Sequence, residues 1–402
     1  MNIGIVTTWF ERGAAYVSKQ FESVLSVSHS VFIYARGGEK YEKSDSKWNN
    51  ENVTWGKIVK TPFAGTLINK KDFKKWITKN KIELIIFNEQ HWWIPISWCN
   101  DLNVKTVAYV DYYTESTIPL FAAYDYLICN TKKHFSAFKW HSGAFYVPWG
   151  TDTESFKPHD NDFRLDKIRL FHSCGMNPRR KGTDILLKSL ERIKSENYEL
   201  IIHSQVSLIK FFPELSDLIN HYIKVGKLNV ITKTVTSPGL YFLGDIYVYP
   251  TRLEGIGLTV PEAISSGLGI IVPNCAPMNE FVQSEFGKTV EIEKFFARND
   301  GYYWPQNEVS IESLADCIDE FLSSPEKIPF IKQASRNYAL KMLDWNQNSK
   351  QLLVLINEIK SKEKIKVSDE VLSNLYLYEK IGVKRFNNIA MRFSWLYKLY
   401  LK

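Results

Sequence analysis

Several features that would place a protein in a specialised class are scarce or missing from this sequence. Its 402 residues include only five cysteines, far apart and mostly in apolar stretches. We therefore expect reduced core residues of a cytosolic protein rather than a disulfide framework or a zinc site. No apolar run approaches the roughly 18 residues that a membrane-spanning helix needs. Residues 1–8 lack the basic and apolar regions of a signal peptide and are predicted to form a strand.

Two kinds of ligand motif are also absent. There is no His-x-x-x-His and no Cys-x-x-Cys pair, so we expect a metal-independent reaction with no required cofactor. No Gly-x-Gly-x-x-Gly follows the first predicted strand. A dinucleotide-dependent dehydrogenase is therefore disfavoured.

The charge is moderately basic. The chain has 51 Lys and Arg against 44 Asp and Glu, a net charge of +7, which suits an anionic ligand or an anionic membrane surface. The lysines are scattered, and no helix-turn-helix, zinc-finger or RNA-binding motif occurs. Nucleic acid is therefore not expected as a partner.

Short apolar stretches alternate with amphipathic segments along most of the chain, a pattern typical of parallel α/β folds. The first set of strands ends near residue 148, and a polar stretch separates it from the strand predicted at 168–172. We therefore predict two Rossmann-like parallel-sheet domains facing a cleft, over residues 1–160 and 161–340. In the remaining segment, 341–402, apolar residues recur at helical spacing from Leu352 onward.

The most informative motif is EGIGLTVPE, residues 254–262. It follows a strand-like apolar run and opens a helix, with Pro261 in the first turn and Gly267 at the end. The glycines let a ligand approach the backbone, and free N–H groups at the helix start attract an anion. Since open parallel sheets bind ligands at the carboxyl ends of their strands, Glu254 and Glu262 would accept hydroxyl groups on two sides of that anion. Turn glycines and an early helical glutamate also have purely structural uses.

A second candidate anion site is GMNPRRKG, residues 175–182, between a predicted strand and a helix expected to begin near Thr183. The three consecutive cations Arg179, Arg180 and Lys181 can neutralise a diphosphate leaving group. The sequence leaves open which of the two arginines points inward. A solvated basic loop is the structural alternative.

Residues 250–267 closely resemble the nucleotide-sugar motif of retaining GT-B glycosyltransferases, in particular glycosyltransferase family 4, the group 1 glycosyltransferases. Lys181-Gly182 matches the end of the family's Gly-Arg-x-x-x-x-Lys-Gly motif, whereas Met176 stands where that motif has arginine. The resemblance covers most of residues 1 to about 360. It implies an acceptor-binding first domain, a nucleotide-sugar-binding second domain, and a closing helix after residue 341 that returns to the first domain.

The resemblance also implies roles for single residues. Glu254 is expected beside the donor sugar, Lys181 beside the phosphates and Glu262 at the ribose hydroxyls. The loop that carries Gly13 is similar to the family's glycine-rich loop over the donor phosphates, although a plain tight turn is the alternative. The backbone amides expected at the diphosphate or the sugar are those near Gly257, Leu258 and Thr259.

The catalytic assignment stays open between two residues. Family members often carry a histidine after the strand that corresponds to residues 106–110, where this chain has Asp111. Its carboxylate would orient the acceptor or stabilise positive charge on the sugar, unless it caps a turn. His91 is the rival, although a histidine beside two tryptophans is commonly structural.

Aromatic residues lie near the predicted strand ends of the first domain. Their faces can stack on sugars, which suits a carbohydrate or glycolipid acceptor, while core packing is the alternative for each. These residues are Trp9, Phe10, Trp92, Trp93, Tyr112 and Tyr113.

Taken with the resemblance, the motifs predict a metal-independent retaining hexosyltransferase. It would move a sugar from a nucleotide-diphosphate sugar to a hydroxyl of a glycan or lipid-linked acceptor, in cell-surface polysaccharide synthesis by analogy. Residues 384–402 have the basic, aromatic composition of an interfacial helix. We expect a cytoplasmic protein, with this tail either touching the inner face of the plasma membrane or docking on protein.

Two other readings of the motifs stay open. One is another enzyme of the same fold, a GT-B phosphorylase or epimerase. The other is a noncatalytic nucleotide-sugar or glycan-binding protein, suggested by Met176 and Val110 at positions where the family usually has functional residues.

Overall fold

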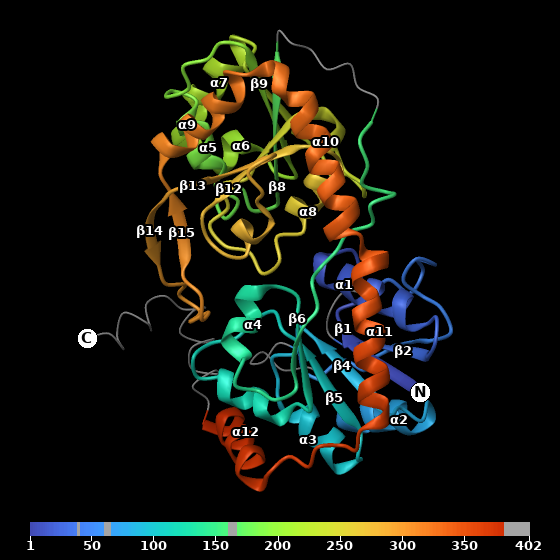
Figure 1. Ribbon diagram of the computed structural model, residues 1–402. Helices are drawn as coiled ribbons and strands as arrows, with labels where there is room; N and C mark the ends of the chain where they lie inside the picture. The colour runs from blue at the N-terminus through green and yellow to red at the C-terminus, as the bar shows by residue number, and fades with distance from the viewer. Residues whose placement is uncertain (38–40, 60–65, 160–166, 382–402) are drawn as a thin grey trace, which may run out of the picture.

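The computed structural model describes residues 1–37, 41–59, 66–159 and 167–381, which form two α/β domains stacked end to end (Figure 1). Each domain has its own sheet, and all neighbouring strands of both sheets run parallel. The expected pair of Rossmann-like domains is confirmed. The tail at 384–402 lies outside the described residues, so its predicted role is untested.

The first sheet has seven strands in the order β3-β2-β1-β4-β5-β6-β7. Its central strands are continuous runs of buried aliphatic residues, as expected for strands covered on both faces. The strands are β1 (Asn2–Thr7), β2 (Ser30–Ala35), β3 (Val53–Trp55), β4 (Leu84–Asn88), β5 (Lys105–Tyr109), β6 (Tyr126–Cys129) and β7 (Ala144–Tyr146). The helices are α1 (Gly13–Leu25), α2 (Lys70–Lys79), α3 (Ile94–Asp101), α4 (Lys132–Phe138) and the 3₁₀ helix η1 (Ile118–Ala123).

The second sheet has six strands in the order β10-β9-β8-β11-β12-β13. Its strands are β8 (Ile168–Gly175), β9 (Tyr198–Ser204), β10 (Leu228–Thr232), β11 (Ile246–Val248), β12 (Gly269–Pro273) and β13 (Gly287–Val290). Its helices are α5 (Thr183–Ser189), α6 (Leu208–Phe211), α7 (Ser216–Lys224), α8 (Thr259–Ser265), α9 (Ile311–Leu322) and α10 (Ile328–Tyr338), with short 3₁₀ turns η2 (Pro213–Leu215), η3 (Tyr241–Leu243), η4 (Met278–Phe281) and η5 (Pro325–Lys327).

The strand order fixes where a ligand is expected. In each sheet the chain winds outward in one direction and then reverses, between β1 and β4 in the first sheet and between β8 and β11 in the second. The loops that leave the carboxyl ends of such a strand pair diverge and leave a crevice. In the second domain, one of these loops is the basic loop after β8, residues 175–182. The other is the segment after β11 that carries Glu254 and Glu262, residues 249–262, which we call the glutamate segment.

One antiparallel hairpin stands outside both sheets. It consists of β14 (Ile292–Phe296) and β15 (Gln306–Val309) and the connecting residues 297–305, and we call residues 292–309 the strap. It is inserted between β13 and α9 and runs from the second domain down to the first (Figure 1). The sequence analysis did not predict it.

The chain crosses back to the first domain after α10. A single π-helical turn, η6 (Ala339–Leu343), leads into α11 (Trp345–Ser361), which packs beside α1 (Figure 1). Thr151, in the outgoing crossing, donates its N–H to Leu343 O at 2.7 Å and accepts from Trp345 N at 3.0 Å. The two crossings therefore run side by side. The last described helix, α12 (Asp369–Ile381), packs on α3 and η1.

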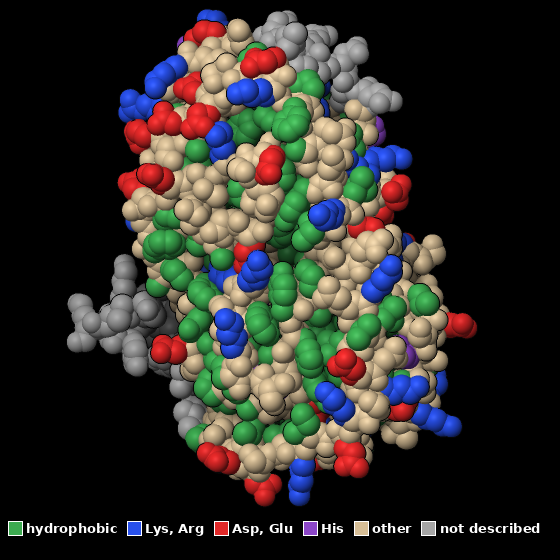
Figure 2. All heavy atoms as spheres, in the orientation of Figure 1, with side chains coloured by type: hydrophobic (Ala, Val, Ile, Leu, Met, Phe, Trp, Pro, Cys, Tyr) green, Lys and Arg blue, Asp and Glu red, His purple; other side chains and the backbone are tan. Residues whose placement is uncertain are grey.

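The surface and the cysteines carry few special features. On the face drawn in Figure 2, basic and acidic side chains are interspersed over both domains. None of the described helices is long and apolar enough to cross a membrane. All five cysteines are unpaired, and all but Cys275 are buried, as expected.

Candidate functional site

The two predicted anion-binding loops meet at the switch point of the second sheet. Lys181, at the end of the loop after β8, donates from Nζ to Glu254 Oε1 at 2.6 Å. The same carboxylate oxygen accepts from Tyr249 Oη at 2.9 Å and Thr251 Oγ1 at 2.8 Å. Arg180 Nη1 lies 3.6 Å from the other oxygen, Glu254 Oε2. Glu254 is thus held in one orientation by four donors or cations.

The electrostatics of this group favour an ionised carboxylate. Burial opposes ionisation of Glu254, but the charges of Lys181 and Arg180 outweigh it and hold its pKa at about 2. Burial lowers the pKa of Lys181, an effect that the charge of Glu254 opposes. The Lys181 and Glu254 pair lies at the carboxyl ends of β8 and β11. It therefore places a cation and an anion side by side where a ligand is expected to bind.

Glu262, the second carboxylate of the motif, lies in the first turn of α8. Its Oε2 accepts from Tyr241 Oη at 2.6 Å. Burial raises the pKa of Glu262 to about 7, and the hydrogen bond from Tyr241 partly opposes the rise. The two glutamates therefore have opposite environments, one strongly ionised and one close to half protonated at neutral pH.

A cavity of about 460 Å³ opens beside Glu262 between the domains. Its walls include strand ends of the second sheet, the turn at 235–240, three residues in or just before α1 (Glu11, Tyr16 and Gln20), and five residues of the crossing segment at 149–156. A Cβ built on Gly13 would lie 3.9 Å from Leu258 Cδ1. The first domain's segment after β1 thus faces Leu258 across the cleft, and the phosphate contact expected of Gly13 stays a prediction.

Helix α4 reaches the second domain from the other side of the cleft. Glu280 accepts from the backbone N–H groups of Lys132 and Lys133, at 2.8 and 2.9 Å, and so caps α4 across the interface. The Lys133 side chain is buried, which lowers its pKa to about 8 although the charges of Cys275, Glu280 and Glu254 oppose the change. Burial and the charge of Lys133 also lower the pKa of His134, to about 3, so its ring is neutral.

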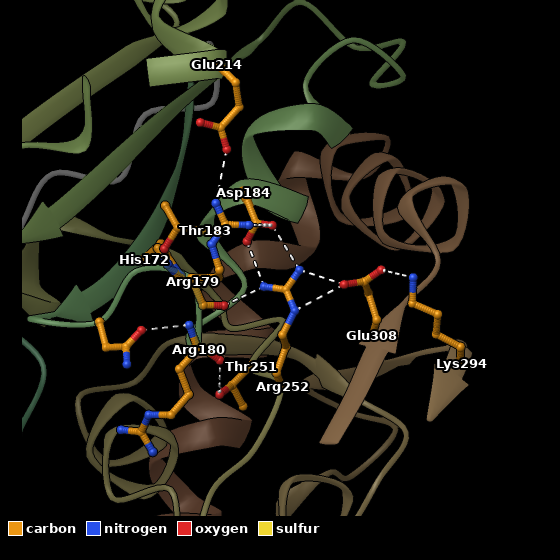
Figure 3. Close-up of polar contacts among 11 residues, drawn as sticks. His172, Arg179, Arg180, Thr183, Asp184, Glu214, Thr251, Arg252, Lys294 and Glu308 are labelled. Carbon is orange, nitrogen blue, oxygen red and sulfur yellow. Dashed lines mark hydrogen bonds and ion pairs between the residues drawn. The ribbon is translucent and has the colours of Figure 1, made fainter. Parts of the chain in front are cut away.

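The three consecutive cations of the basic loop point to different places. Lys181 pairs with Glu254, and Arg180 lies beside the same carboxylate. Arg179 turns the other way, toward Glu214 at 3.0 Å and Asp184 at 3.8 Å (Figure 3). The geometry therefore places Arg180, and not Arg179, beside the Lys181 and Glu254 pair.

Arg252 holds the glutamate segment in place. Its guanidinium donates to both oxygens of Asp184, at 2.7 and 2.9 Å, and to Glu308 of the strap at 2.8 Å (Figure 3). It also donates to the carbonyl of Arg179. These contacts occupy the guanidinium on several sides. Arg252 therefore links the glutamate segment to the basic loop, to α5 and to the strap by hydrogen bonds.

Both catalytic candidates lie in loops at the carboxyl edge of the first sheet. Asp111 follows β5, and burial together with the neighbouring charge of Glu89 raises its pKa. His91 follows β4 and packs edge-on against Tyr112, with ring centroids 5.2 Å apart. Glu89 itself has a positive φ of 52° and pairs with Arg12 at 3.0 Å. A left-handed glutamate at the start of the loop that carries His91 is a strained conformation of the kind found at functional sites.

Three of the six aromatic residues considered for an acceptor are core residues instead. Trp9, Trp93 and Tyr113 are 2%, 4% and 1% exposed. Trp9 Nε1 donates to Trp48 O, and Tyr113 Oη pairs with His134 Nδ1 at 2.9 Å. The polar side-chain atoms of Trp9 and Tyr113 are thus occupied within the protein. Tyr112 remains partly exposed and stacks on Tyr302 of the strap.

Three parts of the site were not predicted from the sequence: the hydroxyl-bearing residues beside the glutamates, Lys133 and the strap. Tyr241, Tyr249 and Thr251 lie beside the motif glutamates, and their role follows only from the fold. Lys133 had a weak signal, because it comes just after a strand end in the run Asn130-Thr-Lys-Lys-His134. The strap had none, because residues 292–309 lack a clear hydrophobic alternation. Within the described ranges, no group of three or more His, Cys, Asp or Glu side chains is arranged to hold a metal ion.

A comparison with known protein families gives a match over most of the second domain. Residues 167–324 match the family model described as glycosyl transferases group 1. Among curated proteins, the sulfoquinovosyl transferase SQD2 of Arabidopsis thaliana is 30% identical over 151 residues, which are 35% of this chain and 28% of that protein. An uncharacterized glycosyltransferase of Sulfolobus islandicus rod-shaped virus 1 is 23% identical over 111 residues, 26% of this chain and 33% of its own length. The matches thus span a third or less of these relatives.

Solved structures resemble most of the chain. Anabaena HepE in complex with UDP has a TM-score of 0.69 at 14% identity, covering 89% of this chain and 99% of that one. A glycosyltransferase from Rickettsia africae has a TM-score of 0.68 at 16% identity, covering 90% and 99%. WaaG, a glycosyltransferase involved in lipopolysaccharide biosynthesis, has a TM-score of 0.59 at 13% identity, covering 88% and 99%. At these identities the likeness establishes the two-domain fold.

Proposed function

We propose that this chain, a GT-B protein whose residues 167–324 belong to the group 1 glycosyl transferases, transfers a sugar from a nucleotide-diphosphate sugar to an acceptor hydroxyl. The observation that carries the proposal is the contact of Lys181 with Glu254 at the switch point of the second sheet. A cation that stabilises leaving-group charge and a carboxylate that accepts sugar hydroxyls are the two groups this reaction needs in one place.

The nucleoside of the donor is proposed to occupy the cavity of about 460 Å³. Glu262 lies in its wall, where an ionised carboxylate can accept both ribose hydroxyls. Leu258 and Thr259 line the same cavity, so the backbone near Gly257, Leu258 and Thr259 is proposed to face the diphosphate or the sugar. HepE was crystallised with UDP, with UDP and glucose, and with UDP-glucose, which makes a uridine nucleotide the first donor to test.

The charge on the departing diphosphate is proposed to be met by Lys181 and Arg180. Arg180 takes this role because it lies beside Glu254, whereas Arg179 points toward Asp184 and Glu214. Each such cation acts where negative charge develops, and loss of one donor of this kind costs about 10²–10³ in rate. With these cations supplying the positive charge, we propose a metal-independent reaction.

For the sugar-transfer step we propose retention by a front-face path, in which the departing phosphate helps to remove the acceptor proton. Retention rests on the family. Asp111 is proposed to face the transferred sugar because it sits at the carboxyl edge of the first sheet in a setting that raises its pKa. Asp111→Asn tests this with little change of size: the proposal expects a loss of transfer at alkaline pH, and unchanged transfer at every pH would leave His91 as the candidate.

The acceptor is proposed to be a glycan or a lipid-linked glycan, in cell-surface polysaccharide synthesis at the cytosolic face of the membrane. WaaG acts in lipopolysaccharide biosynthesis and SQD2 is a sulfoquinovosyl transferase, as their names state. A noncatalytic binding protein is the second candidate. It is favoured by Met176, whose side chain is 73% exposed and which supplies no charge where the family motif has arginine.

The test is a screen of UDP-, GDP-, ADP- and dTDP-sugars without added metal, following both binding and release of nucleotide. One preferred donor with slow release of its nucleotide is the expected result. Nuclear magnetic resonance of the first product then assigns retention or inversion. Tight binding with no release in the presence of any glycan would support the noncatalytic candidate, and no binding at all would contradict both.

A further inference from the structure

The base of the strap is joined to the glutamate segment. Asn307 donates from its backbone N and from Nδ2 to the carbonyl of Arg252, each at 2.9 Å. Glu308, the next residue, accepts from the Arg252 guanidinium at 2.8 Å and from Lys294 Nζ at 2.7 Å (Figure 3). Because Arg252 comes just before Leu253 and Glu254 in the chain, the strap is attached directly to the segment that carries this carboxylate.

The tip of the strap is joined to the first domain through the loop after β5. Tyr303 N donates to Tyr113 O at 2.9 Å, and Trp304 Nε1 donates to Tyr113 Oη at 2.6 Å. In the other direction, Tyr112 Oη donates to the carbonyl of Asp300 at 3.1 Å. Tyr113 is buried, so these bonds lie within the protein rather than on a wetted surface.

Ring and main-chain contacts add to these bonds at the tip. Tyr302 stacks on Tyr112 with ring centroids 5.3 Å apart, and it forms an antiparallel bridge with Thr114. The ammonium of Lys133, at the start of α4, lies 5.2 Å from the centroid of the Trp304 ring, within the range of a cation–π interaction. The tip is therefore packed against two segments of the first domain.

The two domains are thus joined at two places. One is the pair of crossings at 149–156 and 339–345, which are hydrogen-bonded to each other. The other is the strap, which lies on the opposite side of the molecule from α10 and α11 in Figure 1. Two domains joined by a hinge alone are free to open about it. A second attachment away from the hinge opposes that opening.

The strap also joins the two segments that carry the proposed reacting groups. Its base is bonded to Arg252, beside Glu254 of the second domain, and its tip is bonded to Tyr112 and Tyr113, which directly follow Asp111 of the first domain. A displacement of about 1 Å between reacting groups can cost about 10²-fold in rate. An attachment that fixes the separation of these two segments therefore bears directly on the rate of transfer.

We propose that the strap is a brace: its tip stays attached to the loop after β5 during turnover and holds Asp111 and Glu254 at a fixed separation across the cleft. Tyr113 and Trp304 are positioning residues, because they act through Asp111. The assignment rests on the proposed function, which gives the two carboxylates their roles. Most residues that line the cavity of about 460 Å³ belong to the second domain, so the brace should affect the rate of transfer more than the affinity for the donor.

The experiment attaches the tip covalently in the full chain. Thr114→Cys and Tyr302→Cys, at the two bridged positions, are combined with Trp304→Phe, since antiparallel neighbours lie within reach of a disulfide. In the reduced variant the ring stack and the indole hydrogen bond are lost. Transfer should then be roughly tenfold or more slower, with donor affinity nearly unchanged. Oxidation to the disulfide, verified by mass spectrometry of the linked peptides, should restore most of the rate.

Trp140→Phe is the matched control for Trp304→Phe. Trp140 Nε1 donates to Ala137 O within its own turn of the first domain, so the control removes an indole N–H without touching the strap. Trp304→Phe alone should slow transfer, whereas Trp140→Phe should leave the rate unchanged. Small-angle X-ray scattering needs no turnover: the wild type and the oxidised variant should have the same radius of gyration, because the tip of the wild type is already attached.

Three outcomes would overturn the brace. Slower transfer after oxidation than after reduction would show that the tip must detach in each cycle. Equal transfer in the oxidised and reduced forms would leave the strap a purely structural element. A disulfide that does not form, or a larger radius of gyration in the wild type than in the oxidised variant, would show that the tip is not attached in solution. Absence of donor binding and transfer in the wild type would count against the proposed function, and the scattering comparison would still decide whether the strap holds the domains together.

Discussion

Lys181 and Glu254 form an ion pair of 2.6 Å, with their side chains only 14% and 8% exposed. The two residues are 73 positions apart in sequence and come from loops after neighbouring strands, β8 and β11. Each charge is compensated chiefly by the other, so the pair contributes to the fold as well as to the proposed chemistry. The first two predictions separate these contributions.

Lys181→Met should lower the free energy of unfolding by about 3–5 kcal/mol, since it leaves Glu254 buried without its main counter-charge. Lys181→Met combined with Glu254→Gln removes both charges and should recover most of the loss. Both variants should be impaired in sugar transfer by at least about 10²-fold. Urea unfolding and nucleotide release measure the two effects. A single variant as stable as the wild type would mean that the pair is not formed in solution.

Glu254 should also make the free energy of unfolding depend on pH in the acid range. Its pKa in the fold, about 2, lies below the ordinary value of 4.5, so its contribution is complete above pH 4.5 and is lost as pH falls toward 2. The shift corresponds to about 3 kcal/mol. Urea unfolding of the wild type and of Glu254→Gln, at about pH 5 and about pH 3, should show a steeper loss in the wild type. Parallel losses would show that other carboxylates dominate.

Donor affinity should rise with pH through neutrality. Glu262 has its pKa raised to about 7, and only its ionised form offers both oxygens to ribose hydroxyls, so binding should strengthen as the proton leaves. Tyr241→Phe removes a hydrogen bond that favours ionisation and should move the midpoint to higher pH. Glu262→Gln should abolish the pH dependence. Calorimetric titration of the donor at a series of pH values measures this midpoint. An unchanged midpoint in Tyr241→Phe would count against Glu262 as the residue that binds the ribose hydroxyls.

Two glycines of the donor loops should differ in their tolerance of alanine. Gly182 has a φ of +72°, and a Cβ there would lie 1.9 Å from the carbonyl oxygen of Pro250, a backbone atom that cannot easily yield. Gly182→Ala should therefore destabilise the protein by more than the roughly 1–2 kcal/mol of the backbone strain alone. A Cβ on Gly255 would have no neighbour within 4 Å, so Gly255→Ala should leave the thermal midpoint nearly unchanged. Equal midpoints for both variants would contradict this account of the loops.

Much of the fold could be predicted because its signals are local. Buried parallel strands such as Leu84–Asn88 and Ile246–Val248 are largely apolar runs. Pro261 in the first turn of α8 and Gly267 just after its end fit the backbone preferences of those positions. The strap is different. It is held by contacts with Arg252 and Tyr113, which are distant in sequence. No local sequence pattern therefore predicts it.

The candidate site was predictable in part for the same reason. Charged residues that follow strand ends are visible in sequence, and Glu254, Glu262 and Lys181 lie at the switch point. Which way a side chain turns depends on tertiary partners, so the opposite directions of Arg179 and Arg180 could not be derived. The burial of a single side chain cannot be derived from the sequence either. Trp9 and Trp93 are candidate acceptor contacts by sequence, but both lie in the core.

The most direct test of the central claim is a calorimetric titration of UDP-glucose, or of the donor preferred in the screen, into the wild type, Glu262→Ala and Lys181→Ala. The account predicts binding without added metal, roughly tenfold or more weaker binding in Glu262→Ala, and a smaller loss of affinity than of transfer rate in Lys181→Ala. Equal donor affinity and turnover in all three proteins would contradict the placement of the donor between the loops after β8 and β11.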